Sequence, residues 1–153
     1  MVTNMRLDKT GLKDSAAWEA LGYHVPSYDR EQLTENTKKN PEWIHFGAGN
    51  IFRAYQANLM QQLMEEGKSD TGLIVAEGFD YEIIEKMYRP HDDYSILVTL
   101  KGNGEVEKTV IGSIVESLIL DSENDEEFSR LKEIFAAPSL KMASFTITEK
   151  GYS

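Results

Sequence analysis

Cysteine is absent from the sequence. This absence excludes disulfides, thiolate metal sites and cysteine nucleophiles within the chain. Long apolar runs are absent as well: none approaches the roughly 18 to 20 residues that a membrane span requires, and the N-terminus lacks the apolar core of a signal peptide. We therefore expect a soluble, cytoplasmic protein without a membrane partner.

Basic residues are few. Sixteen Lys and Arg stand against 26 Asp and Glu, which gives a net charge of −10. This acidity disfavours general binding to nucleic acid or to anionic membranes, so any anionic ligand must be held locally. The three histidines lack metal-ligand spacing, and we expect no metal site. His45 lies within an apolar run and is expected to be structural, whereas His24 and His91 are expected to be solvated.

The most informative stretch is 43–64, WIHFGAGNIFRAYQANLMQQLM. Its first residues predict a buried strand, and the part after the glycines predicts an amphipathic helix whose apolar stripe is Ile51, Ala54, Tyr55, Leu59 and Leu63. Gly47 and Gly49 permit a tight turn that brings backbone N–H groups close to a ligand, and a helix start favours negative charge. This arrangement predicts an anion site, most often one for phosphate.

The residues after this helix complete the order of a βαβ dinucleotide unit. An apolar run, Leu73 to Ala76, predicts a second strand that ends at Glu77. An acidic side chain there can accept hydrogen bonds from the adenosine ribose and repel a 2′-phosphate, which favours NAD over NADP. Asp80 could do the same, or it could cap a helix over 81–88, and both alternatives stay open.

One feature departs from the usual G-x-G-x-x-G pattern. The third glycine would fall at Phe52, a bulky residue, so helix and strand are expected to pack less closely there. Arg53 then adds a cation beside the phosphate loop.

The second half of the chain predicts further strands and one helix. Alternation over 94–101 and 105–111, around Gly102-Asn103-Gly104, predicts a β-hairpin, and 114–120 predicts a buried strand. We expect Ser122-x-x-Asp125 to cap a helix whose apolar stripe is Phe128, Leu131, Ile134 and Phe135. The run 140–148 predicts another strand with its carboxyl end at the ligand edge. The fold class is therefore α/β, Rossmann-like, with a mostly parallel sheet, flanking helices and an inserted hairpin.

Several segments resemble one family. IHFGAGNIFRAYQA (44–57) resembles the Gly-x-Gly-x-x-x-Arg segment of the long-chain mannitol dehydrogenase family, which includes mannitol 2-dehydrogenases and hexuronate reductases. VPSYDR (25–30) resembles its lead-in to the first strand, and TITEKGY (146–152) its Thr-x-Thr-Glu-x-Gly-Tyr segment. VAEGFDYEII (75–84), with GLKD (11–14), is most similar to the hexuronate reductases.

The resemblance implies an oxidoreductase that uses NAD and a small sugar acid or polyol. We expect cofactor contacts from ten residues: Phe46, Gly47, Gly49, Asn50, Ile51, Arg53, Glu77, Asp80, Thr148 and Glu149. It also implies a lead segment, 1–40, with a short helix, before an NAD-binding domain, 41–153. In the family a catalytic Lys with Asn and His partners lies in a C-terminal helical domain that this chain lacks. We therefore assign no catalytic residue, and Lys150 is a weak candidate.

Two other classes stay open from the sequence. Methyltransferases that use S-adenosylmethionine also combine a strand, a glycine loop and an acidic residue, but typically have Gly-x-Gly-x-Gly, and the third position here is Ile51. A nucleotide-binding module without activity is the other alternative. Because a complete doubly wound sheet would continue beyond 153, we also expect an unpaired sheet edge, exposed apolar surface and self-association.

Overall fold

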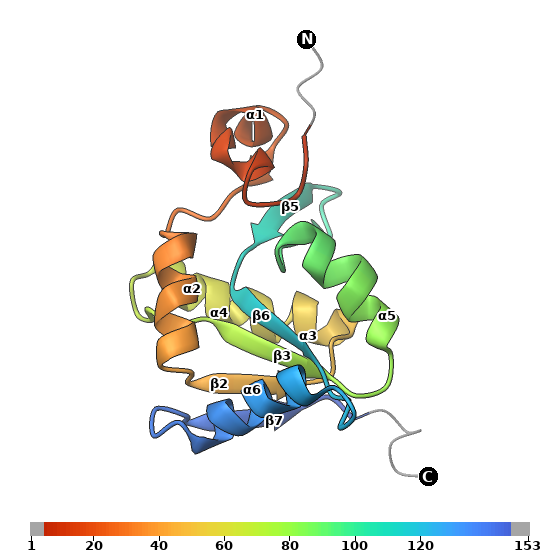
Figure 1. The fold of residues 1–153 in the computed structure, drawn as a ribbon. Coiled ribbons are helices and arrows are strands. Elements are labelled where there is room, and N and C mark those ends of the chain that lie inside the picture. The colour runs from red at the N-terminus through yellow and green to blue at the C-terminus, as the bar shows by residue number, and fades with distance from the viewer. Residues whose placement is uncertain (1–4, 148–153) are drawn as a thin grey trace.

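The computed structural model describes residues 5–147 and contains two sheets. The larger sheet has the strand order β6-β3-β2-β7, and its neighbouring strands pair in parallel. The strands are β2 (Trp43–Phe46), β3 (Leu73–Glu77), β6 (Ile114–Ile119) and β7 (Met142–Phe145). This arrangement confirms the predicted α/β class with a mostly parallel sheet (Figure 1).

Helices cover both faces of the larger sheet, as predicted (Figure 1). On one face, α3 (Asn50–Ala54) and α4 (Gln56–Glu65) pack on the side chains of Leu73 and Val75. On the other face, α6 (Asp125–Ala136) buries Ile134 against Ile44 and Ile74. The alternation of strand side chains between two cores is the period-2 pattern that a doubly covered sheet requires.

The predicted hairpin forms a separate, smaller sheet. Strands β4 (Ser95–Leu100) and β5 (Val106–Ile111) pair antiparallel, and β1 (Tyr23–His24) adds in parallel to β5. The lead segment also contains a 3-10 turn (Gly11–Lys13) and α1 (Ser15–Ala20), whose Trp18 is buried with Tyr94 and Val110. The lead segment therefore packs against the hairpin through a core of its own.

The expected short helix of the lead segment is α2 (Arg30–Lys39). Its N-cap is Asp29, whose side chain accepts a hydrogen bond from the Gln32 N–H at 3.0 Å, as Asp commonly does at this position. Leu33 of α2 is buried against Met64 and Val115, which anchors the helix beside β6.

The predicted apolar stripe after the glycine turn was wrong. Ile51 and Tyr55 are 65% and 67% exposed, and Leu59 and Leu63 also face solvent. The buried face is instead Phe52, Ala57, Met60, Gln61 and Met64. The polar residue Gln61 made this face hard to recognise from the sequence. It is buried because its side chain accepts from Tyr28 Oη and the Gly112 N–H and donates to the Val110 carbonyl.

The predicted helix over 81–88 is not a uniform α-helix. One α-turn, α5 (Tyr81–Ile83), continues as a π-helical turn (Ile84–Tyr88) and a 3-10 turn (Arg89–His91). The irregularity lies directly before and around Pro90, which lacks an N–H for the helical ladder and bends the chain.

Two boundaries in the second half also differ from prediction. Helix α6 is capped by Asn124, whose side chain accepts from the Glu127 N–H, and not by Ser122. Of its predicted stripe, Ile134 is buried but Phe135 is 51% exposed. Strand β7 is shorter than the predicted 140–148. Within residues 5–147, no helix combines the length and apolar content that crossing a bilayer requires.

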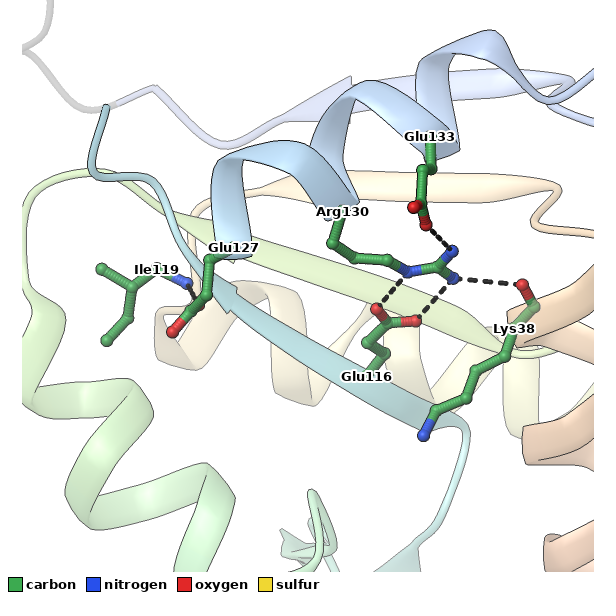
Figure 2. A network of polar contacts seen from close by, with 6 residues as sticks. All are labelled: Lys38, Glu116, Ile119, Glu127, Arg130 and Glu133. Carbon is green, nitrogen blue, oxygen red and sulfur yellow. Dashed lines mark hydrogen bonds and ion pairs between the residues drawn. The ribbon is translucent and has the colours of Figure 1, made fainter. Parts of the chain in front are cut away.

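The outer edge of β6 is covered by side chains. The guanidinium of Arg30 donates to the carbonyl oxygens of Gly112 and Ile114, each at 2.7 Å, and Glu127 accepts from the Ile119 N–H. Figure 2 shows the adjoining network, in which Arg130 of α6 forms a bidentate pair with Glu116 of β6. Backbone groups that would otherwise attract a further strand are thereby occupied.

Arg130 also ties α6 to the end of α2. Its guanidinium donates to Glu133 and to the Lys38 carbonyl, each at 3.2 Å, in addition to the pair with Glu116 (Figure 2). One side chain therefore joins β6, α6 and α2.

The outer edge of β7 differs from that of β6 in the side chains that lie near it. Among the described residues its one strand partner is β2, and apolar side chains near it are exposed: Phe135, Met142, Phe145 and Ile147. The expected apolar surface at a sheet edge is therefore present.

Candidate cofactor-binding site

The glycine turn lies at the carboxyl ends of β2 and β3. Gly47 has φ +113°, which side-chain-bearing residues rarely adopt, and its N–H donates to the Ala76 carbonyl at 2.9 Å. A Cβ at Gly47 would also lie 3.2 Å from the Thr146 carbonyl oxygen. Gly49 has ordinary extended backbone, and a Cβ there would meet nothing within 4 Å. Gly47 is thus required by the turn, whereas Gly49 leaves open space in front of it.

Ala48, between the two glycines, is fully buried, and both its N–H and its carbonyl are hydrogen-bonded to side chains. Its N–H donates to Glu77 Oε2 at 2.8 Å, and its carbonyl accepts from Tyr88 Oη at 2.9 Å. Burial raises the pKa of the Tyr88 phenol above its ordinary value, so Tyr88 remains a donor at neutral pH. Tyr88 ends the π-helical turn that follows α5, and the sequence offered no signal that its hydroxyl would bond to the glycine turn.

Below the turn, Phe52 fills the place of the third glycine. Its ring stacks on His45 with a centroid distance of 4.1 Å and an interplanar angle of 2°. The ring nitrogens of His45 each lie 2.8 Å from a hydroxyl, Nδ1 from Ser144 Oγ and Nε2 from Thr146 Oγ1. Burial lowers the pKa of His45 to about 4, so the ring is neutral at physiological pH. The expectation of a satisfied structural histidine is confirmed.

The carboxylate of Glu77 faces the backbone of both neighbouring loops. Besides Ala48, it accepts from the N–H groups of Phe79 at 2.9 Å and Asp80 at 3.3 Å. Asp80 occupies the N-cap position of α5, but its side chain makes no capping hydrogen bond there and is exposed. Phe79 between them is 95% exposed.

Arg53 and Asn50 lie on the other side of the turn. Their side chains hydrogen-bond to each other, and the guanidinium of Arg53 lies 5.7 Å from the centre of the Tyr88 ring. Together with Ala54 and residues 95–97 of β4, they line a cleft of about 230 Å³. The cation predicted beside the phosphate loop is therefore near it, held between α3 and β4.

The structure brings six of the ten predicted cofactor residues to this edge of the sheet, namely Gly47, Gly49, Asn50, Arg53, Glu77 and Asp80. Ile51 projects into solvent. The Phe46 side chain is on the opposite face, where it stacks on Phe145 at 4.8 Å, which leaves only its backbone near the turn. Thr148, Glu149 and Lys150 lie outside the described residues.

The other two histidines behave differently. His24 is exposed and lies 3.6 Å from Glu107, as a solvated residue would. His91 was wrongly expected to be solvated: it is half-buried, and its Nδ1 lies 3.0 Å from the Leu7 carbonyl, because the lead segment folds over this loop.

Comparisons with known proteins identify relatives over nearly the whole chain, although no family model matches it. The chain is 51% identical over 149 residues to D-mannonate oxidoreductase of Thermotoga maritima, covering 97% of the chain and 28% of that protein. It is 31% identical over 130 residues to D-mannonate oxidoreductase of Escherichia coli, covering 83% of the chain and 24% of that protein.

Among solved structures, Pseudomonas fluorescens mannitol 2-dehydrogenase, in a ternary complex with NAD and D-mannitol, matches with a TM-score of 0.76. The identity is 25%, and the match covers 97% of this chain and 28% of that one. The chain thus spans about a quarter of the length of these relatives. Over that span, it belongs to the long-chain mannitol dehydrogenase family, as its glycine segment predicts.

Proposed function

We propose that the chain is the cofactor-binding part of an NAD-dependent oxidoreductase that interconverts D-mannonate and D-fructuronate by hydride transfer. The observation that carries this proposal is the glycine turn at the carboxyl ends of β2 and β3, with the carboxylates of Glu77 and Asp80 beside it. Ligands of open α/β sheets bind at this edge. The relatives that bear the name D-mannonate oxidoreductase support the substrate.

In this proposal the backbone of Gly47, Gly49 and Asn50 lines the cofactor pyrophosphate, with Arg53 as a nearby cation. The open space at Gly49 lets a phosphate approach the main chain. A carboxylate beside the adenosine ribose, from Glu77 or Asp80, disfavours a 2′-phosphate and so favours NAD over NADP. The cofactor carries the redox chemistry, and this chain's residues bind and orient it.

Replacing Gly49 with Val tests the phosphate contact. The backbone there is extended and the added side chain meets open space, so the variant should fold while blocking close approach. We expect NADH affinity to fall about tenfold or more, which corresponds to about 1.4 kcal/mol. Fluorescence titration of NADH measures this loss, and unchanged affinity in a folded variant contradicts the assignment.

Competition with S-adenosylmethionine in the same titration addresses the methyltransferase alternative. The named relatives are oxidoreductases, which supports hydride transfer over methyl transfer. Displacement of NADH by S-adenosylmethionine at comparable concentration would favour the other class.

The 153-residue chain should bind cofactor without turning over substrate, because the carboxylates described at this edge, Glu77 and Asp80, lie where they can hold the glycine turn and the cofactor. D-Fructuronate reduction with NADH, compared at equal concentration with the full-length enzyme, tests this. Tagaturonate and fructose assayed in parallel distinguish the related reductase and mannitol 2-dehydrogenase activities. Turnover by the short chain would place a catalytic group within it, with Lys150 the first suspect.

A further inference from the structure

The structure assigns different tasks to the two acidic residues beside the glycine turn. We propose that Glu77 is a positioning residue that ties the glycine turn to the loop 78–80, and that Asp80 alone is the direct acceptor for the adenosine ribose. This inference rests on the proposed function, and it decides between two residues that the sequence leaves equivalent.

The hydrogen bonds of Glu77 carry the first step. An ionised carboxylate offers about four acceptor positions on its two oxygens. Three are occupied by backbone N–H groups: Ala48 on Oε2, and Phe79 and Asp80 on Oε1. A ribose diol presents two neighbouring hydroxyls and is best held by two acceptor positions, one on each oxygen. Glu77 retains only one such position, on Oε2.

The contacts of Glu77 span two loops that are distant in sequence. Ala48 follows β2 and Phe79 follows β3, and the same carboxylate bonds to both. The Ala48 peptide is held from its other side by Tyr88. The turn cannot change its conformation without breaking the partly buried, charge-assisted hydrogen bond between Ala48 and Glu77, so Glu77 fixes both loops before any ligand arrives.

The side chain of Asp80 differs from that of Glu77 in its exposure and in its hydrogen bonds. Its backbone N–H is held by Glu77, but its side chain is exposed and makes no capping bond to α5. Both of its oxygens can accept hydroxyl donors, and its charge stands where it would repel a 2′-phosphate. The loop 78–80 thus presents the Asp80 carboxylate, and Glu77 holds the backbone of that loop in place.

Two variants separate these tasks in the 153-residue chain. Asp80→Asn should leave thermal stability unchanged and shift the NADH to NADPH affinity ratio by about tenfold toward NADPH, because it removes the discriminating charge. Glu77→Gln should weaken both cofactors by a similar factor, about tenfold, and leave the ratio unchanged, because its amide group meets N–H donors. Glu85→Gln, exposed on the following turn, removes the same charge and serves as the control.

Amide hydrogen exchange without cofactor supplies an independent readout. In Glu77→Gln, exchange at Ala48, Phe79 and Asp80 should accelerate, whereas Asp80→Asn should leave the Ala48 amide protected. A ratio shift in Glu77→Gln with none in Asp80→Asn would overturn the assignment, as would unchanged exchange at Ala48 in Glu77→Gln. If the unaltered chain binds neither NADH nor NADPH, the proposed function fails, while the exchange data still decide whether Glu77 holds the two loops.

Discussion

The two edges of the four-stranded sheet are built differently. At β6, charged side chains from α2 and α6 occupy outward-facing backbone groups, and Arg130 adds a bidentate pair with Glu116. At β7, the neighbouring side chains are exposed and apolar. The first edge is closed within this chain, whereas the second offers the kind of surface on which another element can pack. The stability of the described unit should therefore depend on the β6 edge far more than on the β7 edge.

Arg30→Ala should have the largest effect. The guanidinium donates to three carbonyl oxygens, those of Asp92, Gly112 and Ile114, and lies 4.6 Å from the centre of the Tyr94 ring. Losing charged donors to partly buried carbonyls should reduce the free energy of unfolding by about 4 kcal/mol. Urea denaturation measures it. Arg30→Lys keeps the charge but not the forked guanidinium donors, so it should retain only part of the stability that Arg30→Ala loses. A loss below about 1 kcal/mol in Arg30→Ala would contradict a closed β6 edge.

Glu116→Ala should have the next largest effect. Both partners of the pair are largely buried, with 11% and 24% side-chain exposure for Glu116 and Arg130. Removing one partner leaves the other charge poorly compensated, at an expected cost of about 2 to 3 kcal/mol. A double-mutant cycle with Arg130→Met isolates the pairwise coupling, and a coupling near zero would show that the network in Figure 2 only shields the edge without stabilising it.

Acidification tests how β7 is held from its inner side. His45 contacts Ser144 and Thr146, and burial lowers its pKa to about 4. Because the folded state disfavours the protonated ring, its contribution is fully present above the unfolded pKa of about 6.5 and is lost as the pH falls toward 4. We expect a loss of about 2 kcal/mol over that interval. Urea denaturation at a series of pH values checks it, and a His45→Gln variant with the same pH dependence would exclude His45 as the cause.

Phe145→Ser should have the smallest effect on stability. Phe145 is 59% exposed at the outer edge, so the free energy of unfolding should change by less than about 1 kcal/mol. We expect the exposed apolar edge to promote self-association, and sedimentation velocity should show less of it in the variant. Phe52→Ser, at a fully buried ring stacked on His45, is the contrasting change and should unfold the site. Destabilisation by Phe145→Ser equal to that by Phe52→Ser would contradict the small contribution of the β7 edge to stability.

The parts of the fold that the sequence predicted correctly are those in which local pattern and tertiary environment agree. The run at 73–76 is apolar because both faces of β3 are buried, and the hairpin alternates around a glycine turn. The glycine turn was predictable because Gly47 needs a backbone that other residues avoid. These signals involve residues close together in the chain.

Prediction failed where a distant contact decided the outcome. Gln61 is buried only because Tyr28, Val110 and Gly112 satisfy its amide, and none of these lies near it in sequence. The register shift in β6 lies where Leu73 pairs with Ile114 and Ile74 with Glu116. It places Val115 with Leu33 and Met64 and leaves Glu116 to pair with Arg130. For the candidate site, the sequence predicts both carboxylates without distinguishing them, and the difference in their hydrogen bonds depends on which backbone N–H groups the fold brings to Glu77.

Substitutions at the two glycines of the turn should have different consequences in a living cell. A substitution at Gly47 forces an unfavourable φ and a close contact, so the product should be degraded, and the phenotype would be missing protein. A substitution at Gly49 costs the fold little, so the cell should accumulate a stable chain that, under the proposed function, no longer admits NADH. Protein quality control would remove the first variant, whereas only growth that depends on the enzyme's product would reveal the second.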